Sequence, residues 1–160
     1  MKPTVILLMG SRDLTEPGVV AGTLADIAFN IAEGPVIVRH GACPGANSAD
    51  QNASDWINSI GNRHGVLEDP MPADWDNCAP SCPPPDGHRR IKRPGDTAHP
   101  GLLPDYCPGA GPRRNAAMVA KQPRPEYGIA FPEPGQPNYG TRNCTRLAEA
   151  AGIPVKQITP

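Results

Sequence analysis

Short apolar runs and helically spaced apolar positions alternate along most of this chain. Residues 4–9 (TVILLM) form a continuous apolar run that ends at Gly10, and such a run is typical of a strand buried on both faces of a parallel sheet. Pro17 then stands where the first turn of a helix tolerates proline, and Gly34 ends the pattern that follows. The apolar positions of the predicted helix between them are Val20, Leu24, Ile27, Ala28 and Ile31.

A second strand and a second helix follow in the same order. Residues 36–38 (VIV) predict another buried strand, and residues 41–47 predict a loop of small residues. The next helix is predicted from about Ser48 to a stop at Gly61, and residues 65–68 form a weak third strand. The apolar face of this second helix comprises Ala49, Ala53, Trp56, Ile57 and Ile60.

Regular spacing returns towards the end of the chain. A short helix is predicted from Pro112, a fourth strand at residues 129–131, a helix at 141–151 and a fifth strand at 153–158. Strands that alternate with helices form parallel βαβ units with right-handed crossovers. We therefore expect an α/β fold, a three-layer Rossmann-like parallel sheet of about five strands, in a single domain over residues 1–160.

Residues 77–111 interrupt this alternation and form a predicted insert. Half of the 22 prolines of the chain lie between Pro70 and Pro112, and no apolar periodicity is left there. A loop of this length inside a compact domain is usually functional or cross-linked. The insert carries metal-ligating residue types in the order Cys78-x3-Cys82, His88, His99 and Cys107.

The cysteines of the insert favour a metal site. The chain has five cysteines, an odd number, and clustered cysteines in a cytosolic protein suggest metal before a disulfide. Four protein ligands would make a structural zinc site, and zinc would supply folding free energy to a segment without a core. The predicted ligands are Cys78, Cys82, His88 and Cys107, with His99 as the rival fourth ligand. Unlinked thiols or a disulfide are the alternatives.

Sheets of this kind bind ligands outside the carboxyl ends of their strands, and small and polar residues stand there in this chain. Gly10, Ser11 and Arg12 directly follow the first strand, and an arginine there suits a phosphate or a carboxylate. Gly41 and Ala42 begin the loop before the second helix, whose N-terminus attracts anions. The simpler alternatives are a glycine turn with a solvated arginine and an ordinary connecting loop.

A second glycine-bearing loop precedes the last helix and contains Gly135, Gly140 and Thr141. Two such loops facing one crevice favour a phosphate cradle over a flexible connection. Arg114 and Asn115, on the helix after the insert, either point into the same crevice or lie in solvent.

Asp50 is the candidate catalytic residue, since it lies in the first turn of the second helix, beside the crevice. It either stabilises the helix start or accepts hydrogen bonds from ribose hydroxyls. Cys43 fits a small loop residue better than a nucleophile, and Trp75 is predicted to form a wall of the crevice.

Charge and hydropathy argue against two classes of partner. The formal net charge is −1 and aromatic residues make up 4% of the chain, so the electrostatic field and the stacking surface of nucleic-acid binders are missing. The longest apolar run near the start is shorter than a membrane span or a signal-peptide core. We therefore expect a soluble cytoplasmic protein without nucleic-acid or membrane partners.

The order of these motifs resembles the YspA-like branch of the SLOG superfamily, a Rossmann-like nucleotide-binding group that includes the LOG phosphoribohydrolases and DprA. Many relatives occur in actinobacteria and their phages, which implies a bacterial or phage-encoded protein of the host cytoplasm. The matching motifs cover nearly the whole chain and are Gly10-Ser11-Arg12, His40-Gly41-Ala42, Ala49-Asp50-x2-Ala53-x2-Trp56, Pro72-Ala73-Asp74-Trp75, Ala110-Gly111-Pro112-x-Arg114-Asn115-x2-Met118, Tyr139-Gly140-Thr141 and Gly152-Ile153-Pro154-Val155.

The resemblance implies a crevice for a nucleotide derivative, and it leaves self-association open because members often form dimers or larger assemblies. This chain departs from the family at Ser48, where a glycine usually stands, and after Thr141, where LOG enzymes carry a glutamate and this chain has Arg142. The residues assigned to the crevice lining are Ser11, Arg12, Asp50, Arg114, Asn115, Gly140 and Thr141.

The leading hypothesis is a sensor or sequestering module for an NAD- or ADP-ribose-like molecule, since two glycine loops stand without a complete catalytic set. The alternative is a nucleoside-phosphate or N-glycosidic hydrolase that uses Asp50 as its carboxylate. An Asp50→Asn variant separates the two, because a hydrolase would lose its base.

Overall fold

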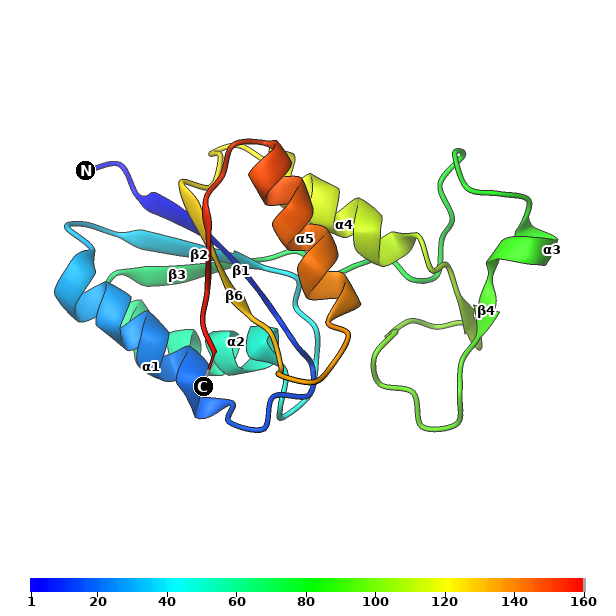
Figure 1. The fold of residues 1–160 in the computed structure, drawn as a ribbon, viewed down its shortest axis with the longest axis horizontal. Coiled ribbons are helices and arrows are strands. Elements are labelled where there is room, and N and C mark those ends of the chain that lie inside the picture. Colours follow the sequence, from blue (N-terminus) through cyan, green and yellow to red (C-terminus); the bar gives the residue numbers. More distant parts are fainter. Residues whose placement is uncertain (160) are drawn as a thin grey trace.

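Five parallel strands form the central sheet, in the order β3-β2-β1-β6-β7 (Figure 1). The computed structural model describes residues 1–159, with the side chains of all but residues 85 and 86. The expected α/β fold with a five-stranded parallel sheet is confirmed. The strands are β1 (Thr4–Gly10), β2 (Val36–His40), β3 (Val66–Pro70), β6 (Tyr127–Phe131) and β7 (Val155–Gln157).

Helices cover both faces of this sheet. The first side comprises α1 (Gly18–Asp26) and α2 (Ala49–Ser59), and the second comprises α4 (Ala110–Ala120) and α5 (Tyr139–Ala150). Because successive side chains of a strand point to opposite faces, Ile6 and Leu8 pack in the core under α1 and α2, whereas Leu7 and Met9 pack under α4 and α5. The continuous apolar run of β1 therefore fills two cores at once.

Two predicted apolar positions are not buried. The helix that begins with α1 continues as a π-helix, η1 (Ile27–Ile31), and its wider turn leaves Ile31 61% exposed. Ile60 lies beyond the last residue of α2, next to a 3₁₀ turn, η2 (Gly61–His64), and is 45% exposed. Helical spacing predicted both as core positions, and the change of backbone geometry at each helix end is the reason for the error.

Several element ends also differ from the predicted ones. α4 begins at Ala110, so the last two residues of the predicted insert are helical, and α5 begins at Tyr139 instead of Thr141. β3 extends to Pro70, whereas β7 is only three residues long. The described residues contain no helix with the length and apolar character that a membrane crossing needs.

The insert (residues 77–111) lies beside the sheet and its helices, next to the start of α4 (Figure 1). Sequence reasoning predicted one irregular loop, but the segment contains a one-turn helix, α3 (Pro85–His88), and a two-stranded antiparallel hairpin of β4 (Arg90–Ile91) and β5 (Asp105–Tyr106). Between residues 71 and 109, Cys107 is the only described side chain that is buried. The insert therefore has no apolar core of its own.

Candidate functional site

A pocket of about 540 Å³ lies at the carboxyl ends of β1 and β6. β2 and β3 extend the sheet on one side of β1, whereas β6 and β7 lie on the other side. The strand order therefore reverses between β1 and β6, and this is the place where open parallel sheets bind ligands. Three parts of the chain line the pocket: the loops after β1 and β2, the start of α5 with the loop before it, and the insert with the start of α4.

The turn after β1 brings the backbone close to α2. A Cβ atom on Gly10 would meet the Cβ of Ala49 at 2.5 Å, so this position requires glycine. The N–H of Ser11 donates to the carbonyl of Phe131 at 2.9 Å, and the Ser11 carbonyl accepts from the N–H of Ala49. Arg12 is exposed at the pocket, and no hydrogen bond or ion pair holds its guanidinium within the described residues.

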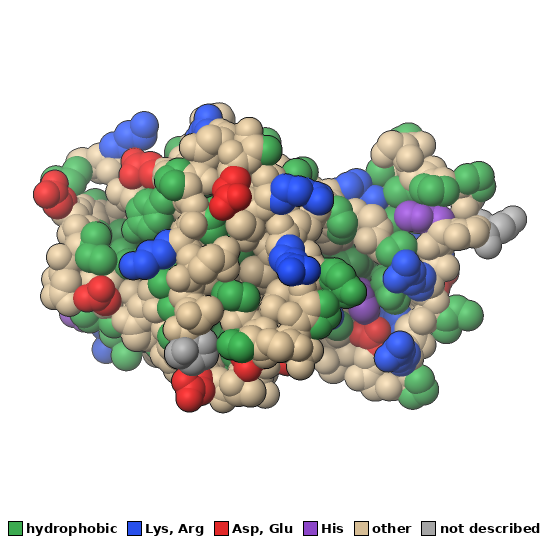
Figure 2. All heavy atoms as spheres, viewed as in Figure 1, with side chains coloured by type: hydrophobic (Ala, Val, Ile, Leu, Met, Phe, Trp, Pro, Cys, Tyr) green, Lys and Arg blue, Asp and Glu red, His purple; other side chains and the backbone are tan. Residues whose placement is uncertain are grey.

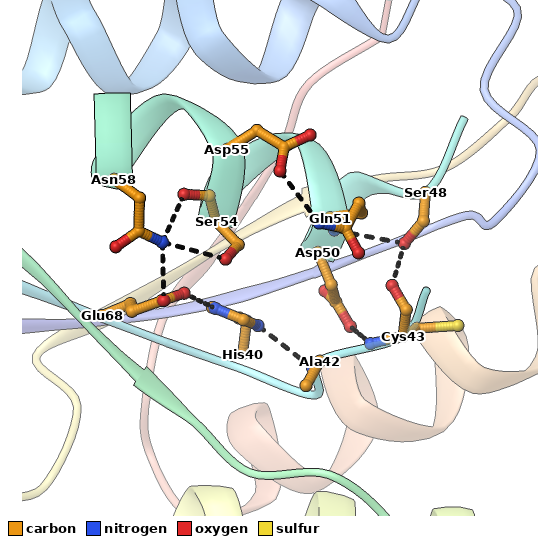
Figure 3. A network of polar contacts seen from close by, with 10 residues as sticks. All are labelled: His40, Ala42, Cys43, Ser48, Asp50, Gln51, Ser54, Asp55, Asn58 and Glu68. Carbon is orange, nitrogen blue, oxygen red and sulfur yellow. Dashed lines mark hydrogen bonds and ion pairs between the residues drawn. The ribbon is translucent and has the colours of Figure 1, made fainter. Parts of the chain in front are cut away.

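The loop after β2 is held closed by side chains (Figure 3). The His40 ring bonds to Glu68 through Nε2 at 2.8 Å and accepts the N–H of Ala42 at Nδ1 at 3.0 Å. Asp50 accepts the N–H of Cys43 at 3.1 Å. The N–H groups of Ala42 and Cys43 are thus bonded within the protein, and Ala42 is not among the residues that line the pocket.

Asp50 is buried and lines the pocket, yet its carboxylate already has a structural role in the loop. Burial raises the pKa of this carboxyl, and the hydrogen bond from the Cys43 N–H and the charge of Arg114 offset the rise only in part. Burial likewise raises the pKa of the Cys43 thiol to about 11. Cys43 is therefore a neutral thiol near pH 7, as a small loop residue would be, and not an activated nucleophile.

Arg114 and Asn115 line the pocket but do not reach into it freely. The Arg114 guanidinium donates to the carbonyl of Gly41 and to that of Met71 at 3.2 Å. Asn115 is 5% exposed and donates to Oδ1 of Asn143 at 3.0 Å. Of the two predicted positions, crevice or solvent, the arginine takes the crevice, where its guanidinium is bonded to carbonyls of the loops after β2 and β3.

The first turn of α5 has backbone N–H groups without a partner among the described residues. Asn138 has a φ of +50°, and its side chain bonds to both the N–H and the carbonyl of Glu133, so it does not cap the helix. The first turn carries no acidic residue, and Gly140 and Thr141 line the pocket. Gly135, also predicted as a ligand residue, does not line it. An uncapped helix start with its positive dipole end favours an anion.

Glu133 has a role that sequence reasoning missed. It is 5% exposed, and its carboxylate accepts the hydroxyl of Thr15 at 2.6 Å. This contact joins the loop after β6 to the loop after β1, on either side of the strand-order reversal. The signal in the sequence was an acidic residue close behind a buried strand, at the edge where polar side chains meet.

Three aromatic rings form the wall on the side of the insert. The His99 ring is stacked on Tyr106 with 3.7 Å between centroids and an interplanar angle of 8°. Trp75 meets His99 edge-on at 4.7 Å. All three rings are half-buried and line the pocket, together with the exposed Arg90. Trp75 is thus a pocket wall, as predicted, and we call these three residues the aromatic wall.

The predicted metal ligands Cys78, Cys82, His88 and Cys107 come together in the insert. Their ligand atoms all lie within 4.8 Å of one another, with 3.8 Å between the sulfurs of Cys82 and Cys107. A tetrahedral site with metal–sulfur bonds of about 2.3 Å needs sulfurs about 3.8 Å apart. This cluster could therefore hold a metal ion. His99, the rival ligand, bonds to Asp96 through Nδ1 at 2.8 Å and is not in the cluster.

Cations surround the thiols of this cluster. Arg113 donates to Sγ of Cys82 at 3.2 Å and of Cys107 at 3.5 Å, and Arg89 donates to Sγ of Cys78 at 3.5 Å. Burial alone would raise the pKa of Cys107, but hydrogen bonds from Arg113 and His88 lower it to about 6. The thiolate form of Cys107, the form that binds metals, is thus favoured at neutral pH.

The sequence matches no protein-family model, and searches of curated proteins and of solved structures also found no match. The resemblance to the YspA-like branch of the SLOG superfamily therefore stays a prediction.

Proposed function

We propose that this protein binds a nucleotide-derived small molecule, of the NAD or ADP-ribose kind, as a sensor or sequestering module. One observation carries the proposal: the pocket at the strand-order reversal has free anion-binding groups on one side and an aromatic wall on the other. Nucleotide derivatives combine these two chemistries, since they carry phosphates and a flat ring.

The phosphate end is proposed to lie at the start of α5. There the uncapped first turn, with Gly140 and Thr141, supplies backbone N–H donors. Arg12, from the other side of the reversal, supplies a guanidinium without a protein partner among the described residues, and guanidinium groups bind phosphates in a bidentate manner. A diphosphate fits both groups at once.

The ring end is proposed to lie against the aromatic wall. Aromatic side chains bind flat rings through stacked and edge-on contacts, and Trp75, His99 and Tyr106 present both kinds of ring surface. The volume of about 540 Å³ lies within the usual range for small-molecule and cofactor pockets, about 300–1,000 Å³.

The metal of the cluster in the insert is proposed to be zinc in a structural role. Three thiolates and one imidazole are a common structural zinc set, and four protein ligands leave no open position for catalysis. Zinc binding would supply the folding free energy that the insert lacks, since it has no core.

A second function, hydrolysis of an N-glycosidic bond, is favoured by the position of Asp50 alone. Its carboxyl lines the pocket, and its raised pKa suits an acid–base group. The hydrogen bond to the Cys43 N–H also gives this residue a structural task. We therefore rank binding first.

Calorimetric titration of the full chain with ADP-ribose tests the proposal, with adenosine as the probe that lacks phosphates. Arg12→Gln should weaken ADP-ribose binding about tenfold or more, since a hydrogen bond to a charged group contributes about 1.5–3 kcal/mol, and should leave adenosine binding unchanged. Arg63→Gln, an exposed arginine outside the pocket lining, is the matched control.

Two results would overturn parts of this proposal. Absence of ADP-ribose binding at millimolar concentration, or equal binding by the Arg12→Gln variant, would contradict the assigned phosphate site. Free adenine or ribose phosphate in the titrated samples, lost in the Asp50→Asn variant, would show the hydrolase instead.

A further inference from the structure

One small hairpin connects the aromatic wall with the four possible metal ligands, which we call the metal cluster: Cys78, Cys82, His88 and Cys107. β4 follows His88 after one residue, and β5 ends directly before Cys107. Arg90 and Tyr106 are paired in the register of this hairpin, so two metal ligands lie at the same end of its two strands. A metal bound by His88 and Cys107 therefore clamps the hairpin where the pocket-lining residues Arg90 and Tyr106 stand.

The main chain at Cys107 also holds the wall. The N–H of Cys107 donates to the carbonyl of Trp75 at 2.8 Å, and Tyr106, its neighbour in sequence, is stacked on His99. The position of one metal ligand thus fixes two of the three rings. Trp75 also packs on α4, where a Cβ on Gly111 would meet its ring at 3.0 Å.

Apart from the metal ligands, hydrogen bonds near the surface hold the hairpin, such as those from Arg89 to the Asp76 carbonyl and from the Leu102 N–H to the Asp76 carboxylate. Each strand has two residues, and a hairpin of this size is not stable alone in water. Cys107 is the only buried side chain described between residues 71 and 109. The Arg89–Asp105 ion pair, with 2.9 Å between Nε and Oδ2, is partly exposed, so water and salt screen it.

From these contacts we propose that metal binding at the cluster controls the ligand pocket: zinc orders the aromatic wall, and its loss opens the wall and weakens ring binding. The ligand part of this inference rests on the proposed function, whereas the coupling between metal and wall does not. Linkage makes the coupling reciprocal, so ADP-ribose must raise zinc affinity by the factor by which zinc raises ADP-ribose affinity.

The wall can be observed without any ligand. The chain has two tryptophans, so ¹⁹F NMR of the full chain labelled with 5-fluorotryptophan gives one signal from Trp56, in the core under α1 and α2, and one from Trp75, in the wall. A Trp75→Phe variant assigns them. Zinc removal by a chelator should shift or broaden the Trp75 signal and leave the Trp56 signal in place, and zinc addition should reverse the change.

Titration with ADP-ribose then measures the consequence for binding. Its affinity should fall about tenfold or more in zinc-free protein and in the Cys82→Ser variant. Cys144→Ala, which removes a thiol from the core under α4 and α5, is the control and should keep both zinc and affinity. Gly111→Ala should displace Trp75 and weaken ADP-ribose while zinc stays bound, because no metal ligand is changed.

The outcomes separate the two proposals. A Trp75 signal that is unchanged when zinc leaves, or a full chain that takes up no zinc by native mass spectrometry, overturns the coupling. Failure of the zinc-loaded chain to bind ADP-ribose overturns the proposed function, while the Trp75 signal still decides whether metal and wall are coupled.

Discussion

The two walls of the pocket are held in place by different kinds of interaction. On the side of the sheet, apolar packing and parallel strand pairing position the loops, and β1 alone places four buried residues in the two cores. On the side of the insert, Cys107 is the one buried side chain described before α4 begins, and the segment otherwise has a short hairpin and a cluster of possible metal ligands. One wall is thus part of the global fold, whereas the other would depend on the metal bonds that we propose for the cluster.

The largest effect is expected from a cavity in the core beneath the sheet side of the pocket. Phe131 is fully buried at the end of β6, and Phe131→Ala should lower the free energy of unfolding by about 3–5 kcal/mol, because a large cavity remains. Urea unfolding followed by circular dichroism measures it. Leu102→Ala, in the insert and 96% exposed, is the matched control and should change stability by less than about 0.5 kcal/mol. Equal losses of unfolding free energy in both variants would contradict the conclusion that core packing holds the sheet side of the pocket and not the insert side.

Removal of the proposed zinc should disorder the insert side of the pocket and leave the sheet side unchanged. Hydrogen exchange of the insert amides, such as those of Tyr106 and Cys107, should speed up at least tenfold after chelation, because local opening no longer needs to release the metal. The amides of β1 and β6 should keep their protection, since their packing does not involve the cluster. If the whole chain lost protection together, sheet and insert would be one cooperative unit.

The smallest expected effect is a pH dependence of the unfolding free energy, which the ion pairs of Asp69 on the sheet side should cause and those of the insert should not. Burial alone would raise the pKa of Asp69, but hydrogen bonds from Lys121 and Arg39 lower it below its usual value. Its ion pairs therefore stabilise the fold above the unfolded pKa of about 3.9 and are lost as pH falls through the lower folded value. The change should be about 1 kcal/mol.

Acid unfolding curves of two variants check this sign. Asp69→Asn should remove that part of the pH dependence. Asp105→Asn, which removes the exposed carboxylate paired with Arg89 in the insert, should leave global unfolding unchanged at every pH. A wild-type protein that gains stability between pH 4 and pH 2 would contradict the assignment.

Positively charged side chains are spread over the face in Figure 2, and the coloured part of this view shows no continuous basic band. This distribution agrees with the small net charge. Nucleic-acid binding usually requires a basic surface, so the distribution also agrees with the proposal of a small-molecule ligand.

The sequence by itself determined the alternation of strands and helices, the position of the insert and the four members of the metal cluster. Apolar periodicity indicates which residues are buried, and cysteine and histidine are metal-ligating residue types wherever they stand. Local sequence patterns were therefore sufficient to predict these features. The same patterns failed at Ile31 and Ile60, where the backbone departs from α-helical geometry.

Only the tertiary structure decided which polar groups are free to meet a ligand. Arg114, Asp50 and the N–H of Ala42 looked available in sequence, but each is bonded within the protein. Arg39, fully buried against Asp69 and three carbonyls, gave no sequence signal at all. The physical reason is that a buried polar group takes whichever partner the packing brings within about 3 Å. The partners of Arg39 and the carbonyls that hold Arg114 lie far away along the chain.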